Sequence, residues 1–262
     1  MGLTRQASGT GACHEDPVDR RTPADYVVAL AGNPNTGKST VFNALTGLNQ
    51  HTGNWPGKTV IQAKGQYKYG GKTVTVVDLP GTYSLLATSV EEVIARDFLC
   101  FGEPDATVVV VDATCLERNL HLVLQVLEIT PQVVVCVNLM DEAGRKKLRV
   151  DTVKLEQLLG VPAVPTVACR GKGLARLKEA IDQTASGGIT GKPPRLQYPA
   201  EIEAAARSLE NDLAPILPAW LDARWVALRL LDGDGSLLDE IEEYTAARWC
   251  EREVEVSCPP RR

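Results

Sequence analysis

One eight-residue segment restricts the folds open to this chain of 262 residues. Residues 32–39 read Gly-Asn-Pro-Asn-Thr-Gly-Lys-Ser, which fits the pattern G-x-x-x-x-G-K-[ST]. An apolar, strand-like run, Tyr26–Ala31, precedes the segment, and the helix-like Thr40–Thr46 follows it. In that context the glycines let backbone N–H groups fold around phosphate oxygens, and the helix N-terminus adds positive potential. The segment therefore predicts a phosphate-binding P-loop, with an ordinary glycine-rich turn as the alternative.

The side chains of this loop have different expected tasks. Lys38 is placed to reach the β- and γ-phosphates of a nucleotide, and the Ser39 hydroxyl is placed to bind Mg²⁺. The remaining predicted nucleotide-binding residues of the loop are Asn33, Pro34, Asn35, Thr36, Gly37 and Thr40.

Apolar, β-branched runs alternate with helical patterns as far as Ala185. Such alternation predicts an α/β fold with a mostly parallel, six-stranded sheet and flanking helices. Gly70-Gly71 predicts a tight turn between the second and third runs, which makes one strand antiparallel at the edge of the sheet. The six runs are Tyr26–Ala31, Val60–Tyr69, Thr73–Val77, Ala106–Val111, Val133–Val137 and Val161–Val167.

Glycine and proline interrupt this pattern between Ser186 and Pro199, and helical periodicity without strands follows. The sequence Asp232–Gly235 has its glycines in the wrong places for a calcium loop and predicts a turn between helices. The helical repeat consists of Ile202, Ala206, Leu209, Leu213 and Ile216, then Leu221, Trp225 and Leu228, then Leu237, Ile241 and Tyr244. This spacing predicts a small all-helical domain. The expected division is a disordered tail at 1–24, a nucleotide-binding domain at 25–186, a linker at 187–199, the helical domain at 200–256 and a tail at 257–262.

Two polar motifs follow strand-like runs further along the chain. Asp78-Leu79-Pro80-Gly81 comes directly after Thr73–Val77, and Asn138-Leu139-Met140-Asp141 ends Val133–Val137. Both motifs lie at the carboxyl edge of the predicted sheet, where open α/β sheets bind ligands.

The chemistry of these motifs indicates a guanine nucleotide. Asp78 fits a magnesium-linked carboxylate, and the Gly81 N–H fits a sensor of the γ-phosphate. In the second motif, Asn138 and Asp141 are the predicted base-binding residues. The Asp141 carboxylate can accept hydrogen bonds from N1–H and the 2-amino group of guanine, whereas adenine offers neither donor. A last base-binding element is expected after the next strand, at Ala168 and Cys169.

These motifs in this order match the GTPase superfamily, and two longer segments narrow the resemblance. Gly53–Val60 reads GNWPGKTV and Asp78–Leu85 reads DLPGTYSL. Together with Gly32–Asn35 they resemble the cytosolic G domain of the FeoB family of bacterial ferrous-iron transporters. The likeness covers Asp25 to about Ala185. It continues weakly over Ala223–Asp234, which is similar to the family's helical, dissociation-inhibitor-like domain.

The resemblance implies a P-loop GTPase fold that binds GTP or GDP with Mg²⁺ and converts GTP to GDP and phosphate. It implies that Thr59 ligates Mg²⁺ in the GTP state. It also implies that Asn35, with the carbonyls of Gly53 and Trp55, binds a K⁺ ion. Such an ion would neutralise transition-state charge, as an arginine finger does elsewhere. The predicted catalytic set is Asn35, Lys38, Thr59 and Gly81.

Two residue choices affect how the domain would work. Thr82 stands where Ras-like enzymes carry a water-orienting glutamine, so intrinsic hydrolysis is expected to be slow. Relatives often carry Ser-Ala or Ser-Thr where this chain has Ala168-Cys169. Only a backbone N–H is then left to contact guanine O6, which favours a loose hold on the nucleotide.

The net charge of −5 gives no electrostatic footprint for nucleic acid, and no nucleic-acid partner is expected. An RNA-associated assembly or tRNA-modification GTPase shares the same motifs and is the alternative function. A nucleotide-gated interaction module with incidental hydrolysis is a third. The basic run Arg145–Arg149 is expected to be a solvated loop, with a lipid-headgroup contact as its alternative.

No run of about 18 apolar residues is present, and the polar N-terminus lacks the core of a signal peptide, so a cytoplasmic chain is expected. Seven cysteines without a CxxC pair predict free thiols. Members of the FeoB family continue into a membrane domain that carries iron. The resemblance therefore implies a membrane iron-permease domain outside this chain and a tether to the cytosolic side of the inner membrane. A homo-oligomer is left open.

Overall fold

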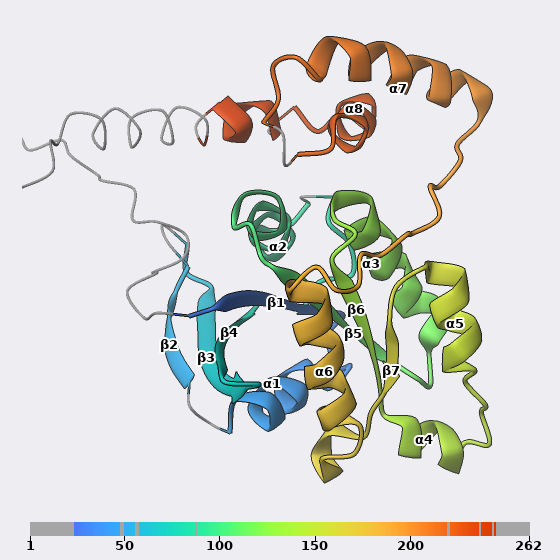
Figure 1. The fold of residues 1–262 in the computed structure, drawn as a ribbon. Helices are drawn as coiled ribbons and strands as arrows, with labels where there is room; N and C mark the ends of the chain where they lie inside the picture. The colour runs from blue at the N-terminus through green and yellow to red at the C-terminus, as the bar shows by residue number, and fades with distance from the viewer. Residues whose placement is uncertain are drawn as a thin grey trace, which may run out of the picture.

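The structure is a computed structural model that describes residues 24–47, 50–55, 58–86, 88–218, 221–235, 237–242 and 244. A seven-stranded sheet forms its centre, with strand order β2-β3-β4-β1-β5-β6-β7. Helices cover both faces of the sheet, and a separate helical part packs against α2 (Figure 1). The strands are β1 (Tyr26–Gly32), β2 (Gln50–Asn54), β3 (Ile61–Tyr69), β4 (Lys72–Asp78), β5 (Ala106–Asp112), β6 (Val133–Asn138) and β7 (Ala163–Pro165).

The helices follow the strands as an α/β fold requires. Those of the sheet domain are α1 (Lys38–Thr46), α2 (Val90–Phe101), α3 (Leu116–Ile129), α4 (Met140–Arg145), α5 (Thr152–Leu159) and α6 (Leu174–Ala185). The helical part contains α7 (Ala200–Leu213) and α8 (Ala223–Leu231), and residues 237–242 are also helical. None of the helices in the described ranges is long and apolar enough to cross a membrane.

Parallel pairing at the centre of the sheet matches the sequence prediction. Strand β1 pairs in parallel with β4 and β5, and β5, β6 and β7 continue the parallel order. Every residue of β6 is buried, because helices cover both faces. One apolar core lies between the sheet and α2, α3 and α5, and the other lies between the sheet and α1 and α6. The sheet therefore holds its carboxyl edge rigidly.

The predicted number of strands was wrong by one. Strand β2 adds a seventh strand outside β3, so the antiparallel strand β3 is not at the edge as predicted. The segment Gln50–Asn54 is polar and has no apolar alternation, and its ladder to β3 holds it in place. Strand β7 is shorter than the predicted Val161–Val167, since Pro162 and Pro165 cannot donate to a ladder.

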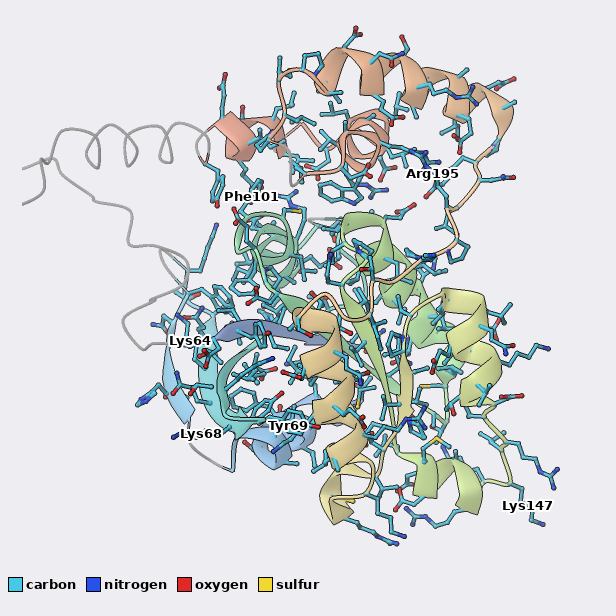
Figure 2. All side chains as sticks on the ribbon, in the orientation of Figure 1. Lys64, Lys68, Tyr69, Phe101, Lys147 and Arg195 are labelled. Carbon is cyan, nitrogen blue, oxygen red and sulfur yellow. The ribbon has the colours of Figure 1, made fainter. Side chains whose placement is uncertain are left out.

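The helical part packs on α2. Its core contains Leu213, Trp225 and Leu237, and Cys100 and Phe101 of α2 belong to the same cluster. Figure 2 labels Phe101 where α2 meets this part. The predicted burial of Trp225 and Leu237 is confirmed, and so is the turn at 232–235.

Two periodic positions of the helical part are exposed and do not belong to its core. Ile202, on α7, is 41% exposed, and Ile216, which lies beyond the end of α7 at Leu213, is 71% exposed.

The link between the two parts crosses α3. Residues 190–199 form neither helix nor strand. The Tyr198 hydroxyl donates to Glu128 on α3 at 2.9 Å, and the buried Arg224 of α8 donates to the Leu196 carbonyl at 3.0 Å. Side chains from both parts thus hold this segment.

The described cysteines are free thiols. Cys100 and Cys136 are buried, and Cys115 and Cys169 are exposed. The other three cysteines, the predicted tail at 257–262 and all but residue 24 of the predicted tail at 1–24 lie outside the described residues.

Candidate nucleotide-binding site

The P-loop takes the shape that its glycines allow. It runs from the end of β1 to Lys38, the first residue of α1. Gly37 has a φ of 80°, and a Cβ there would lie 2.5 Å from the Nδ2 atom of Asn138. Only glycine fits this position, because both the left-handed backbone and the close approach exclude a side chain. Asn35 is also left-handed, with a φ of 67°, and it is exposed.

Lys38 joins the P-loop to the end of β4. Its Nζ donates to Asp78 Oδ1 at 2.5 Å and to the Leu79 carbonyl at 2.6 Å. The two charged side chains are 11% and 16% exposed. Burial raises the pKa of the Asp78 carboxyl above its ordinary value, against the opposing effect of the Lys38 ammonium. A lysine and a carboxylate predicted to serve one nucleotide are therefore in direct contact.

Gly81 lies against the P-loop. A Cβ at Gly81 would come within 3.5 Å of Pro34, and the N–H of the next residue, Thr82, donates to the Gly32 carbonyl at 3.3 Å. The segment after Gly81 is fixed from two sides. Glu92 on α2 accepts from the Ser84 hydroxyl at 2.7 Å, and Gln125 on α3 accepts from the Leu85 N–H at 2.8 Å.

Asn138, at the end of β6, holds two loops together. It is 1% exposed, and its Nδ2 donates to the Thr36 carbonyl at 3.1 Å. Its Oδ1 accepts from the Ala168 N–H at 3.1 Å and the Thr166 hydroxyl at 3.2 Å. Sequence reasoning placed Asn138 among the nucleotide contacts, whereas its amide is engaged in positioning the P-loop and the Ala168 loop. The next N–H, that of Cys169, is then the one to consider for a base contact.

Asp141 has a partner that sequence reasoning missed. Its carboxylate lies 3.6 Å from the Nη2 atom of Arg170, which follows Cys169. The Asp141 side chain is 21% exposed and that of Arg170 is 63% exposed. A guanidinium presents N–H donors to a carboxylate much as the N1 and 2-amino groups of guanine do. The one sequence feature that could have indicated this ion pair is the position of Arg170 directly after Ala168-Cys169.

The residues predicted to bind cations from the GNWPGKTV segment lie apart from this cluster. Gly53 is in β2 and pairs with Gln62. Trp55 is 5% exposed and packs edge to face on Phe98 of α2, with ring centroids 5.6 Å apart. Its carbonyl accepts from the Lys58 N–H at 3.0 Å. Within the described ranges, no hydrogen bond or ion pair links the exposed Thr59 to the P-loop or to Asp78.

The geometry thus brings four sequence elements to one edge of the sheet. They are the P-loop, Asp78–Gly81, Asn138–Asp141 and the loop at Ala168. Serine hydroxyl and carboxylate oxygens are hard ligands of the kind Mg²⁺ prefers, so Ser39 and Asp78 fit that ion. Asn35 is exposed on the P-loop, and its amide oxygen is a suitable ligand for K⁺.

Fold and site together define a GTPase-type G domain followed by a helical domain. Residues 26–181 match the family model described as "Ferrous iron transport protein B", and residues 198–255 match "FeoB cytosolic helical domain". The chain belongs to the ferrous iron transport protein B family. The resemblance inferred from GNWPGKTV and DLPGTYSL is confirmed, as is the fold class.

Curated relatives are much longer than this chain. The Fe(2+) transporter FeoB of Salmonella typhimurium is 41% identical over 211 residues, which span 79% of this chain and 27% of the relative. That of Escherichia coli K12 is 40% identical over 217 residues, with the same two shares. The chain therefore spans only about a quarter of these transporters.

Solved structures match both parts of the chain. The cytosolic domain of L. pneumophila FeoB has a TM-score of 0.77 and 36% identity, covering 84% of this chain and 87% of that chain. The cytosolic domain of the T. maritima FeoB iron transporter in a GMPPNP form has a TM-score of 0.75 and 35% identity, covering 90% and 88%. Two further structures of the T. maritima domain are GDP forms.

Proposed function

We propose that this chain binds guanine nucleotides and hydrolyses GTP as the cytosolic part of a ferrous-iron transport protein. The observation that carries the proposal is the contact of Lys38 with Asp78 at the edge of the sheet where Asn138 holds the P-loop. The GDP and GMPPNP forms of the T. maritima relative support a guanine nucleotide as the ligand.

The nucleotide would change the partners of Lys38. When phosphates enter the P-loop, the Lys38 ammonium exchanges Asp78 for the β- and γ-phosphate oxygens. The Asp78 carboxylate is then free to hold Mg²⁺ together with the Ser39 hydroxyl. That ion would neutralise phosphate charge. Glycine at position 81 lets the backbone approach the γ-phosphate, and its N–H would donate to it.

Base recognition is assigned to Asp141 and to the loop that Asn138 positions. Asp141 would accept hydrogen bonds from the N1 and 2-amino groups of guanine. The Ala168 N–H already donates to Asn138, so the Cys169 N–H would contact guanine O6. A serine hydroxyl is missing from this loop, which supports a loose hold on the nucleotide.

Hydrolysis is proposed to be slow and assisted by K⁺. Asn35 would ligate the ion with its side-chain oxygen, and the carbonyls of Gly53 and Trp55 would complete the set once GTP orders their segment. Thr59 would join the Mg²⁺ ligands in the same state. Among the described residues no arginine forms a hydrogen bond or ion pair with the P-loop or Asp78, so the ion would supply this charge neutralisation.

The wider role follows from family membership and from the length of the relatives. We assign the chain to the cytosolic side of the inner membrane, joined in the natural protein to a membrane iron-permease domain. Iron transport itself would belong to that domain.

Calorimetry with GDP, a GTP analogue and ATP, each with Mg²⁺, tests the central proposal. Guanine nucleotides are expected to bind at least ~10-fold more tightly than ATP, since each unmatched buried polar contact costs about 1–3 kcal/mol. Asp141→Asn should weaken GDP and gain affinity for xanthosine diphosphate, whose ring carries an oxygen in place of the 2-amino group. Equal affinity of the unmodified protein for ATP and GTP would contradict the assignment.

A further inference from the structure

A second hollow lies outside the nucleotide-binding site. It is an open cavity of about 540 Å³ between the start of α3 and the segment 148–158, which includes most of α5. We call it the α3–α5 groove. None of its lining residues belongs to the P-loop, to the Asp78 or Asn138 motifs or to the Ala168 loop.

The groove exposes apolar side chains that a folded chain normally covers. Leu116 and Val150 form part of its lining and pack against the core of the sheet domain. At its rim, Leu148 is 45% exposed and Leu158 is 62% exposed. Clustered apolar exposure of this kind marks interaction sites, whereas single exposed leucines are ordinary.

Cations surround these apolar side chains. Arg118, Arg149 and Lys154 line the groove. Neither Arg149 nor Lys154 takes part in a salt bridge within the described residues. Of the two lining carboxylates, Asp151 is turned to its own helix, where it accepts from the Lys154 N–H at 2.9 Å. The local charge is therefore positive on a chain whose net charge is −5.

The adjoining loop extends the positive surface. Lys146 and Lys147 follow α4 and are exposed. Figure 2 shows Lys147 reaching outward from this loop. Arg145, which precedes Lys146, forms an exposed ion pair with Glu142.

Arg118 links the groove to the nucleotide-binding site. Its guanidinium stacks on the ring of Tyr83, 4.5 Å from the ring centroid. Tyr83 is 45% exposed and lies two residues after Gly81. Tyr83 belongs to the segment that follows the Asp78 motif. A ligand in the groove that contacts Arg118 would therefore touch a side chain that packs on this segment.

We infer that the α3–α5 groove docks an acidic amphipathic segment of a partner protein. Apolar side chains of that segment would cover Leu148 and Leu158, and its carboxylates would meet Arg149 and Lys154. A helix or extended peptide can enter a hollow and place apolar and charged groups alternately. A bilayer surface is flat and would reach only the rim, so lipid headgroups are the less suitable source of negative charge.

A library of random sixteen-residue peptides displayed on phage provides the probe. It is selected on the full chain and counter-selected on Arg149→Glu/Lys154→Glu. Enriched peptides are expected to be acidic and to carry spaced apolar residues. The double variant and Leu158→Gln should each weaken their binding at least 10-fold in fluorescence polarisation. The control Lys68→Glu/Arg176→Glu reverses two exposed cations on β3 and α6 and should change affinity less than 2-fold.

Two exposed cysteines locate the bound peptide. Cys115 lines the groove, and Cys169 lies in the loop beside Asp141. A saturating peptide should slow alkylation of Cys115 at least 3-fold and leave that of Cys169 unchanged, as read by mass spectrometry of tryptic fragments. Thermal unfolding of each variant shows that the chain still folds.

Several results would overturn the inference. One is enrichment of neutral or basic peptides, and another is equal binding of acidic peptides to the charge-reversed variant. A membrane surface would be the occupant if the selection enriches no acidic peptides and the unmodified chain co-sediments with phosphatidylglycerol vesicles while the charge-reversed variant does not. Self-association lost in the same variant would assign it to a second copy of the chain. Failure of nucleotide binding would leave the inference standing, because no step of this test uses nucleotide.

Discussion

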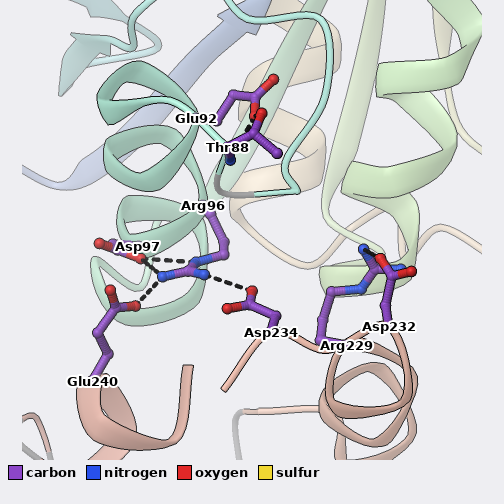
Figure 3. Close-up of polar contacts among 8 residues, drawn as sticks. All are labelled: Thr88, Glu92, Arg96, Asp97, Arg229, Asp232, Asp234 and Glu240. Atoms are coloured by element: carbon purple, nitrogen blue, oxygen red, sulfur yellow. Dashed lines mark hydrogen bonds and ion pairs between the residues drawn. The ribbon is translucent and has the colours of Figure 1, made fainter. Parts of the chain in front are cut away.

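The guanidinium of Arg96 donates to the carboxylate of Asp234 at 2.7 Å, which joins α2 to the turn after α8. Arg96 is fully buried and also contacts Asp97 and Glu240 (Figure 3). Helix α2 begins nine residues after Gly81, and its Glu92 anchors Ser84. The helical part is thus ion-paired to the helix that follows the Asp78 motif. Trp55 packs on Phe98 of the same helix, so α2 meets both the GNWPGKTV segment and the helical part.

Replacing Arg96 by Met should strongly destabilise the chain. The change leaves three carboxylates without their cation, and breaking a buried ion pair costs about 3–5 kcal/mol. Urea unfolding at pH 8, followed by tryptophan fluorescence, measures the loss. Arg145→Met is the matched control, because its exposed pair with Glu142 is worth ~0–1 kcal/mol. Equal losses in the two variants would show that the Arg96 cluster contributes no more than a surface pair.

Glu240 should make stability depend on pH. Burial, and then a hydrogen bond and repulsion from Asp97, raise the pKa of the Glu240 carboxyl from an ordinary 4.5 to about 7, although Arg96 acts in the opposite direction. Asp234 is the other carboxylate on this guanidinium. Between pH 4.5 and about 7, the Glu240 carboxyl loses its proton in the unfolded chain and keeps it in the folded chain. The free energy of unfolding should therefore fall as the pH rises from 4.5 to about 7 and lose this dependence above it.

The measurement is urea unfolding at several pH values from 5 to 8. Glu240→Gln should remove part of the fall in the free energy of unfolding with pH. Glu179→Gln, at an exposed position on α6, should show the same fall as the unmodified protein. An unchanged pH profile in Glu240→Gln would mean that this carboxyl ionises in the folded chain as it does in the unfolded one.

These contacts show what sequence patterns can and cannot predict. The P-loop, Asp78 and Asp141 follow from local motifs, because a strand end fixes where each side chain emerges. Arg96 and Asp234 are 138 residues apart, and no periodicity relates them. Sequence reasoning predicts the turn at 232–235 correctly, yet the turn's role depends on packing against α2. Strand β2 is missed for a similar reason, since its polar residues are held by a ladder to β3 and not by burial.

Positioning roles are harder to predict than contacts with a ligand. Asn138 lies in a motif that indicates base binding, and only the folded structure shows its amide holding Thr36 and Ala168. A motif identifies which residue types occur at a sheet edge. It does not show which of their polar atoms other parts of the protein already use.

Arg170 should compete with guanine for Asp141. Removing the guanidinium in Arg170→Gln leaves the carboxylate free for the base, and an exposed pair of this kind is worth about 0.2–1 kcal/mol. Release of a fluorescent GDP analogue, followed by stopped flow, should therefore become slower by up to ~5-fold. Lys172→Gln removes an equal charge from the same loop and should leave the rate nearly unchanged. Faster release in Arg170→Gln would show that Arg170 helps to hold the nucleotide.

Thr59 should matter in one nucleotide state only. Its segment is held by β3 and α2 and has no hydrogen bond to the P-loop in the described residues, so we expect GDP to bind without it. Thr59→Ala is expected to leave the Kd for GDP within about twofold and to weaken a GTP analogue with Mg²⁺ at least ~10-fold, or 1.4 kcal/mol. Calorimetry with both nucleotides measures this. Equal losses for GDP and the analogue would argue against a role specific to the γ-phosphate.

Potassium should accelerate GTP turnover through Asn35. The Asn35 side chain is exposed on the P-loop, whereas Gly53 and Trp55 lie in and beside β2, so the ligand set would assemble only when GTP draws that segment toward the loop. A cation placed there would lower the barrier by neutralising developing charge, and about 1.4 kcal/mol gives a tenfold rate.

Phosphate release at saturating GTP should therefore be at least ~10-fold faster in KCl than in NaCl of equal ionic strength. Asn35→Ala should abolish the difference and leave GDP binding intact. Asn43→Ala, at an exposed position on α1, is the control and should keep the potassium effect. If the unmodified protein turns over equally fast in both salts, the cation does not act at Asn35, and charge neutralisation must come from another group.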